Sequence, residues 1–406
     1  MPVRTNEGEM IKNLLAFSVL FQVVGCYAQV HAKVSGAAGP IHVPLTADHW
    51  HVLTPSPGGP KPDLGFARHE GFPEGVLVLK SGAALLDGLT FQDGTIQFDI
   101  KAIGEDIPGV QFRVDGPRFA ENGEEFYVRT SPDCRASNDC IQYTPVINGF
   151  MLWNSYPQYQ TQAFILDGWN HIKLVVSGHR MNVYINRLPQ PALTVGSLES
   201  TSGEGHIELR GPAYYANLTV TPDAVEGLSP TPTADPTAAD QGMVRHWQLG
   251  ALRPFVSPAG PTYVDIPKTA SRWKSITAER FGMVNLNRDF TLRFEPPPLT
   301  WLRTIVVSNS EQKKHVSLGW LGRVWVFVNG KLVTQGENLY DIEGERRDPD
   351  GRMSLENGSF DLPLQRGPNE VVVALVSSIH EDKTPNRYGW GLEMRFDDIK
   401  GITLTK

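Results

Sequence analysis

The stretch from Gly94 to Asn186 opens with Gly94-Thr-Ile-Gln-Phe-Asp-Ile-Lys101 and continues with Gly109-Val-Gln-Phe-Arg-Val114, and in both segments apolar and polar residues alternate. The pattern recurs in three further segments, Glu125–Arg129, His171–Val176 and Met181–Ile185. A period of two sends successive side chains to opposite faces of a β-strand. These segments therefore predict strands of one β-sandwich.

The same alternation predicts which side chains share a face. Those expected to point into the core are Phe112, Val114, Phe126 and Val128. Those expected on the opposite, open face are Arg113, Glu125, Tyr127 and Arg129, with Gln142 and Trp153 joining them from the segment that follows. Arginine offers a planar fork of donors and glutamate accepts hydrogen bonds from hydroxyls. This set predicts a ligand-binding face, although a simple cross-strand pair of Glu125 with Arg113 or Arg129 stays open as the alternative.

Length and charge narrow the class of protein. The chain has 406 residues, enough for two or three domains, and its hydrophobic fraction of 40% is ordinary for a globular protein. Its formal net charge of −7 argues against a nucleic-acid partner, which calls for a basic surface.

A segment rich in Pro, Thr, Ala and Asp divides the chain at residues 222–242. It offers almost nothing to bury and predicts a semi-extended linker. The first domain is then expected over residues 31–221 and the second over residues 243–406. In the second half, Asn329-Gly330 follows a β-branched run and predicts a tight type I′ hairpin. The fold class predicted is all-β, with two β-sandwich (jelly-roll) domains joined by a Pro/Thr-rich linker.

Residues 1–30 predict an export segment. An apolar run extends from Leu14 to Cys26 and is too short to span a bilayer comfortably. Val23-Val-Gly-Cys26 resembles a bacterial lipobox, in which Cys26 would be lipidated; cleavage after Ala28 is the alternative. The protein is expected in the cell envelope, the periplasm or the extracellular space, and at a membrane only through this segment.

Cys134 and Cys140 enclose a short polar loop. In an oxidising compartment, two cysteines this close predict a disulfide rather than a metal site. No cofactor is expected. A structural Ca²⁺ is not predicted either, because Asp348-Pro-Asp-Gly351 lacks the ligand spacing of an EF-hand.

The first half resembles the concanavalin A-like lectin/glucanase superfamily, and within it laminin-G-like domains and 3-keto-disaccharide hydrolase domains. The likeness covers about Leu85 to Val220 and rests on six segments: "DGTIQFDIK", "GVQFRV", "EEFYVR", "GWNHIKLVVSG", "MNVYINRLPQPAL" and "AYYANLTV". The second half resembles galactose-binding-like jelly rolls in "GRVWVFVNGKLVTQGENLYD", "FDLPLQRGPNEVVVAL" and "YGWGLEMRF". These resemblances imply a carbohydrate partner. The glucan-cleaving branch carries flanking glutamates on one strand, whereas here the comparable strand has only Asp99.

Three classes of function stay open. The leading hypothesis is an exported protein that binds carbohydrate on the first sandwich. The alternative is a glycan-degrading enzyme on the same face, either a 3-keto-glycoside hydrolase or a polysaccharide lyase, which would cleave a glycosidic bond with Glu125, Tyr127 and His171 as candidate catalytic residues. In the lyase, Arg113 or Arg129 would neutralise a uronate. The third class is a structural or adhesive envelope module with no small ligand.

The export hypothesis gives the first testable prediction. Cys26→Ser is expected to release the protein from the membrane fraction, because the lipid would be attached to the sulfur atom of the lipobox cysteine. Fractionation of cells followed by N-terminal sequencing checks this. A wild-type protein that is wholly soluble and begins at Gln29 would show ordinary cleavage instead.

Overall fold

The computed structural model describes residues 39–53, 61–104, 106–116, 122–163, 165–257, 259–269, 272–290, 296–340, 349–377 and 388–405. The predicted export segment, with Cys26, lies outside these residues. Residues Ala37–Lys406 form one compact unit. In the described part of the chain, no helix is both long enough and apolar enough to cross a membrane.

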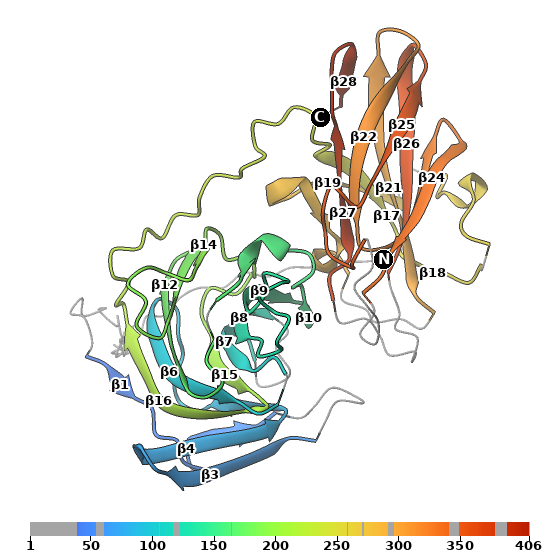
Figure 1. Cartoon of the computed structure of the whole chain (residues 1–406). Coiled ribbons are helices and arrows are strands. Elements are labelled where there is room, and N and C mark those ends of the chain that lie inside the picture. Colours follow the sequence, from blue (N-terminus) through green and yellow to red (C-terminus); the bar gives the residue numbers. More distant parts are fainter. Residues whose placement is uncertain are drawn as a thin grey trace, which may run out of the picture. The chain divides into compact units, whose positions relative to one another are not determined.

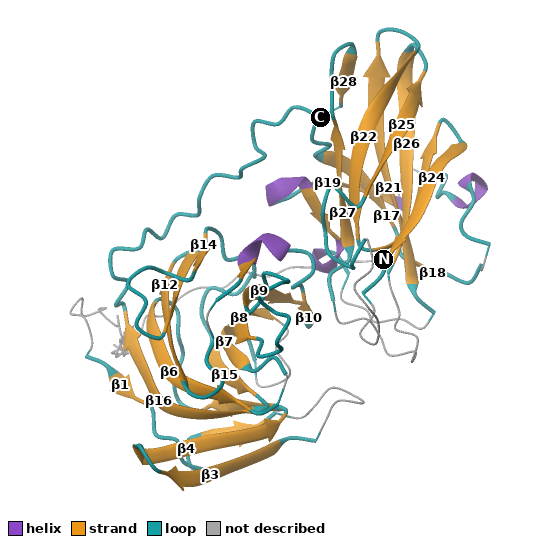
Figure 2. Cartoon of the chain, viewed as in Figure 1, coloured by secondary structure: helices purple, strands orange, loops and turns teal. Residues whose placement is uncertain are grey.

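Two antiparallel sheets make up the first sandwich (Figures 1 and 2). The first, the β6 sheet, has the order β14 (Leu193–Val195), β13 (Arg180–Ile185), β12 (Asn170–Ser177), β6 (Gly94–Ala102), β16 (Ala213–Pro222), β4 (Phe72–Ser81) and β3 (Asp63–His69), with β1 (Ile41–His42) paired to β16. The second, the β7 sheet, has the order β10 (Phe150–Met151), β9 (Ile141–Ile147), β8 (Asn122–Val128), β7 (Gly109–Val114), β15 (His206–Arg210), β5 (Ala83–Leu86) and β2 (Trp50–Val52), with β11 (Gln160–Thr161) paired to β9.

One apolar core lies between these two sheets. Ile96, Phe98 and Ile100 of β6 enter it from one side, and Phe112 of β7 and Phe126 of β8 enter it from the other. Alternate residues reach the core because the strand period is two, as the sequence predicts. All five predicted strands of this half are present.

The second sandwich also has two antiparallel sheets. The β21 sheet has the order β19 (Trp273–Thr277), β17 (His246–Gly250), β21 (Pro298–Ser308), β26 (Gly367–Val376), β23 (Gly322–Val328) and β24 (Lys331–Asn338), with β18 (Arg253–Pro254) and β28 (Ile402–Leu404) paired to β21. The β22 sheet has the order β20 (Met283–Asn285), β27 (Gly391–Phe396), β22 (Gln312–Trp320) and β25 (Gly358–Leu364). The fold is thus all-β, which confirms the predicted class.

The β21 sheet is apolar on both faces. Val371, Val373 and Leu375 belong to the core shared with the β22 sheet. Val372 and Ala374 belong to a separate cluster on the opposite face. This is why β26 reads as an unbroken apolar run rather than as an alternation. The predicted hairpin joins β23 to β24, with Asn329 and Gly330 both at positive φ (47° and 84°), as a type I′ turn requires.

Short 3₁₀ turns complete the described elements: η1 (Pro157–Tyr159), η2 (Tyr263–Asp265), η4 (Arg280–Gly282) and η5 (Leu286–Arg288). No strand lies between Pro222, where β16 ends, and His246, where β17 begins, and every residue of that interval is described. Hydrogen bonds hold this segment, since the amide of His179 donates to Pro230 O at 2.9 Å and the amide of Phe281 donates to Asp235 Oδ1 at 3.0 Å.

A β-bulge interrupts β7 at Arg113. The register between β7 and β15 shifts, so that Val114 pairs with His206 while Gln111 pairs with Glu208. Arg113 has a φ of +55°, which is sterically costly for a residue with a Cβ. Its side chain donates to Gln92 O and to Asp93 Oδ1, both at 2.8 Å. Because Asp93 directly precedes β6, this ion pair ties the two sheets together.

This tie yields a stability prediction. Arg113→Ala is expected to lower the free energy of unfolding by about 3 kcal/mol, because it removes one partner of a largely buried pair. Arg113→Gly is expected to be about 1 kcal/mol less destabilising, because glycine adopts a positive φ without strain. Equilibrium unfolding in urea measures both variants. Two variants as stable as the wild type would mean that the ion pair contributes nothing to the fold.

Candidate functional site

Six of the polar side chains on the face of the β7 sheet that points away from the core form one group, which we call the polar face. Its members are Gln111, Glu125, Tyr127, Gln142, Glu208 and Arg210. Strand register places them in two rows. Glu208, Gln111 and Glu125 lie side by side on β15, β7 and β8. Two residues further along the strands, Arg210 on β15, Tyr127 on β8 and Gln142 on β9 form the second row. Directly opposed residues on adjacent strands point to the same side of a sheet.

A buried ion pair occupies the centre of the polar face. Arg210 Nη1 donates to Glu125 Oε1 at 2.7 Å, and Gln111 Nε2 donates to Glu125 Oε2 at 3.0 Å. Burial raises the pKa of Glu125, and the charge of Arg210 opposes that shift. A carboxylate has about four lone-pair sites, so Glu125 can accept two further hydrogen bonds.

A second hydrogen-bonded group surrounds Tyr127. Its hydroxyl donates to Gln142 Oε1 at 2.7 Å, and Arg129 Nη2 donates to the same amide oxygen at 2.9 Å. The guanidinium of Arg129 also lies 4.9 Å from the centre of the Tyr127 ring. Gln142 Nε2 in turn donates to Trp153 O at 2.9 Å. The four residues therefore hold one another in fixed orientations.

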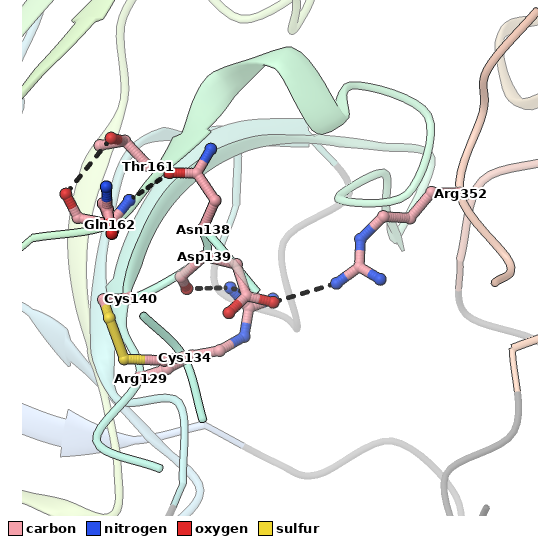
Figure 3. Close-up of a disulfide and its surroundings, with 8 residues drawn as sticks. All are labelled: Arg129, Cys134, Asn138, Asp139, Cys140, Thr161, Gln162 and Arg352. Carbon is pink, nitrogen blue, oxygen red and sulfur yellow. Dashed lines mark hydrogen bonds and ion pairs between the residues drawn. A yellow bond between two sulfur atoms is a disulfide. The ribbon is translucent and has the colours of Figure 1, made fainter. Parts of the chain in front are cut away.

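The predicted disulfide is confirmed and positions a carboxylate beside this group (Figure 3). Cys134 and Cys140 are bonded, with a Cα–Cα distance of 4.7 Å. Asp139, the residue before Cys140, accepts a bond from Arg352 Nη2 at its Oδ2 atom (3.0 Å), and its carbonyl accepts one from Arg129 Nη1 (2.6 Å). The closed loop thus holds Asp139 against two arginines.

Glu208 differs from Glu125 in its surroundings. It is 1% exposed, and no hydrogen-bond partner for its Oε2 atom is found in the described part of the chain. Burial raises its pKa from 4.5 to about 8, against the lowering effect of Arg210. Glu208 is therefore an uncharged acid at neutral pH, although it shares a face with the ionised pair.

Two amide oxygens on or beside the polar face also lack partners among the described residues. They are Oε1 of Gln111, which is 3% exposed, and Oε1 of Gln160, which lies opposite Gln142 in the register of β11 and β9. The Nε atom of Arg352, a nearby donor, also lacks a hydrogen-bond partner among the described residues. Buried polar groups are normally hydrogen-bonded, so these atoms call for a ligand or water.

Three predictions about this sheet are wrong. Arg113 does not belong to it, because the bulge turns its side chain toward Asp93 and the other sheet. The bulge also reverses the alternation after Phe112, so Val114 packs against Val146 rather than in the main core. The face is not open: Glu125, Tyr127 and Gln142 are each at most 1% exposed. The side chains of Arg129 and Arg210 are more exposed, at 16% and 23%.

Two other candidates lie apart from the polar group. His171 is on β12 of the β6 sheet, where its Nδ1 lies 2.8 Å from Asp99 Oδ1, so the structure does not bring it to Glu125. The Trp153 ring packs edge-on against Tyr340 at 4.7 Å and lies beneath the Arg352 guanidinium at 5.1 Å. Its carbonyl, rather than its ring, contacts the polar face.

Three residues of the site were missed from the sequence: Gln111, Glu208 and Arg210. His206-Ile-Glu-Leu-Arg210 does alternate, and that signal was available. What the sequence does not reveal is that β15, about a hundred residues after β7, pairs with it. Among the described residues, no group of three or more His, Cys, Asp or Glu side chains is placed to hold a metal ion.

Comparisons with known proteins add likenesses of fold. No protein-family model and no curated protein sequence matches the chain. Among solved structures, the carbohydrate-binding module CBM66 from Bacillus subtilis is 16% identical, with 43% of this chain and 91% of that one covered and a TM-score of 0.27. A protein of unknown function with a galectin-like fold from Bacillus subtilis is 15% identical (46% and 97% covered, TM-score 0.32). A β-glucanase from Bacillus licheniformis is 13% identical (46% and 99%, 0.28).

Likenesses this distant transfer no activity to this chain. The galactose-binding-like resemblance of the second half stays a prediction.

The buried acids give a prediction about pH. Burial raises the pKa of Glu208 to about 8, and it does the same for Glu124, which faces the core and accepts a bond from the Tyr143 hydroxyl at 2.6 Å. In the folded chain both groups keep a proton that the unfolded chain loses near pH 4.5. The free energy of unfolding is therefore expected to fall as the pH rises from about 5 to about 8.

Glu208→Gln is expected to make this fall shallower, because the amide stays uncharged throughout, and Glu124→Gln should do the same for its own share. Urea unfolding at pH 5, 6.5 and 8 compares the three proteins. Equal slopes in the wild type and both variants would show that neither acid stays protonated in the folded chain.

Proposed function

We propose that the protein binds carbohydrate on the polar face of its first sandwich. The observation that carries this proposal is a pair of buried polar atoms without partners, Oε1 of Gln111 and Oε2 of Glu208, beside a carboxylate with unused lone pairs on Glu125. Sugar hydroxyls both donate and accept hydrogen bonds, so they suit such a set. The rigid group around Tyr127 supplies a preorganised border.

The energetics also support a role beyond packing. A buried ion pair usually stabilises a fold no more than well-packed apolar residues of similar volume would, because both charges must first leave water. A face that only had to pack would do as well with leucine and valine, and one such patch, Leu53, Ala83 and Leu85, lies beside it. The polar face is costly, and ligand recognition accounts for that cost.

An oxidising environment outside the cytoplasm belongs to the same proposal. The disulfide between Cys134 and Cys140 supports it, because such bonds persist mainly in secreted and envelope proteins. Attachment to a membrane through Cys26 is proposed from the sequence alone. Binding is proposed to need no cofactor.

Cleavage of a glycosidic bond is a second candidate for the same face. Glu125 and Glu208 lie on strands separated by β7, and their surroundings differ: Glu125 is paired with Arg210, whereas burial raises the pKa of Glu208 to about 8. Two carboxyl groups in different environments are what an acid and a base of a glycosidase require. Release of reducing sugar that is lost in Glu208→Gln would establish this activity.

Binding itself is tested by calorimetric titration with a panel of oligosaccharides. Glu125→Gln is expected to weaken the affinity of any ligand found by about 10- to 150-fold, since a hydrogen bond to a charged group contributes roughly 1.5–3 kcal/mol. Glu70→Gln is the matched control. Glu70 is exposed and lies away from the site, so this variant makes the same change from carboxylate to amide without touching the polar face.

Circular dichroism and thermal unfolding must first show that both variants are folded. If no oligosaccharide binds the wild type, or if Glu125→Gln binds as tightly as Glu70→Gln does, the proposed site is wrong.

A further inference from the structure

Four aromatic rings meet on the face of the β6 sheet that points away from the core, on the side of the first sandwich opposite to the polar face. We call these rings, on His69, Phe72, Trp169 and Tyr214, the aromatic cluster. The centre of the Trp169 ring lies 4.3 Å from that of Phe72, 5.5 Å from that of His69 and 6.4 Å from that of Tyr214. His69 is exposed and the other three are half-buried. The cluster is therefore part of the surface rather than of the core.

Three polar side chains continue from the aromatic cluster along the same face. Asn217 Nδ2 donates to Asp99 Oδ2 at 2.6 Å, and His171 Nδ1 lies 2.8 Å from Asp99 Oδ1. We call these three residues the Asp99 triad. Lys101, two residues along β6 from Asp99, pairs in register with Tyr214 on β16, so the triad and the cluster adjoin (Figure 1). The His171 side chain is 43% exposed, and Asn217 is exposed as well.

A β-bulge in β16 places Asn217 in the triad. The register between β16 and β6 shifts between Ala216 and Thr219, and Asn217 has a φ of +50°. This left-handed conformation is unfavourable for a residue with a Cβ, and asparagine tolerates it better than most. Bulges commonly re-aim a side chain next to a site. Here the bulge brings the Asn217 amide to the Asp99 carboxylate.

A cavity of about 250 Å³ opens beside the triad and shares Asn217 with it. Val43 and Leu45 give it an apolar wall, and His42 and Glu74 add polar groups. This volume is at the small end of ligand pockets, so the cavity suits one sugar residue rather than a whole oligosaccharide.

We propose that this face is a second carbohydrate-binding site, with one sugar residue in the cavity beside Asn217 and a neighbouring sugar stacked on the aromatic cluster. A pyranose ring has apolar C–H faces and a rim of hydroxyls that donate and accept hydrogen bonds. The cluster offers rings to the first of these features, and the Asp99 triad offers fixed polar groups to the second. The proposal goes beyond the polar face and does not depend on it.

Packing alone does not account for this arrangement. Rings that served only to close the sandwich would be buried, as Phe98 and Tyr215 of the same sheet are. An exposed aromatic patch next to oriented polar groups is instead typical of a binding surface.

The two sites would face opposite directions. They lie on the outer sides of two sheets that enclose a core about 10 Å thick, so one short oligosaccharide cannot reach both. A protein with both sites would therefore bridge two glycan chains.

The test is binding to insoluble cellulose, xylan, chitin and curdlan, measured as the affinity for each solid. Because the polar face alone would retain the protein, the variants are compared in the Glu125→Gln background. Should Glu125→Gln fail to fold, Gln111→Ala supplies the background. Circular dichroism must show that every variant is folded.

In this background, Trp169→Ala and Asn217→Gly are each expected to weaken the remaining binding by about 10-fold or more, because each removes a central contact. Trp169→Phe keeps an aromatic ring and should retain most of the affinity. Asn329→Gly is the matched control for Asn217→Gly. It makes the same change at another left-handed asparagine, in the hairpin of the second sandwich, and should leave binding unchanged.

The outcomes distinguish the two proposals. If Trp169→Ala and Asn217→Gly bind as the background does, or if the background binds nothing, the second site is wrong and the polar face stands. If Glu125→Gln binds as tightly as the wild type while Trp169→Ala abolishes binding, the polar face is wrong and the second site stands. Wild-type protein that binds none of the four polysaccharides overturns both.

Discussion

Desolvation of charge is the constraint on which the polar face depends. Taking a guanidinium and a carboxylate out of water costs several kcal/mol each, so Arg210 and Glu125 are tolerable there only as a close, hydrogen-bonded pair. The same constraint raises the pKa of Glu208 to about 8, even though Arg210 lowers it. One physical cost thus acts on both acids of the polar face.

The two sides of the β7 sheet obey different rules. Toward the core, Phe112 and Phe126 pack against apolar neighbours. Glu124 is buried there as well, and a hydrogen bond from the Tyr143 hydroxyl offsets part of the cost of burying it. On the other side, polar groups are held by one another and by the disulfide loop through Asp139. The core-facing side of the β7 sheet therefore provides apolar packing, and the opposite side presents a hydrogen-bonded polar group.

Sequence reasoning worked where a local pattern determines the outcome. Strands β6, β7, β8, β12 and β13 were predictable, because alternation expresses the strand period directly, and the disulfide was predictable from a spacing of six. Arg113 was misplaced because a bulge has no signature in its residues. Glu208 and Arg210 were missed because strand pairing over a long sequence separation is a property of the whole sheet. Of the six polar-face residues, Glu208 and Arg210 were therefore out of reach of local patterns, whereas Gln111 lay on a predicted strand and was overlooked.

The bulge at Arg113 has a consequence for how this protein can change over evolution. It divides β7 into a part that contacts the polar face, at Gln111, and a part that ties the two sheets, at Arg113. Substitutions at position 111 would alter the polar face without disturbing the tie. Deletion of one residue at the bulge would restore the alternation, turn Val114 inward and remove the tie. The surface chemistry of β7 is therefore free to drift at one position, while a neighbour two residues away is fixed by folding.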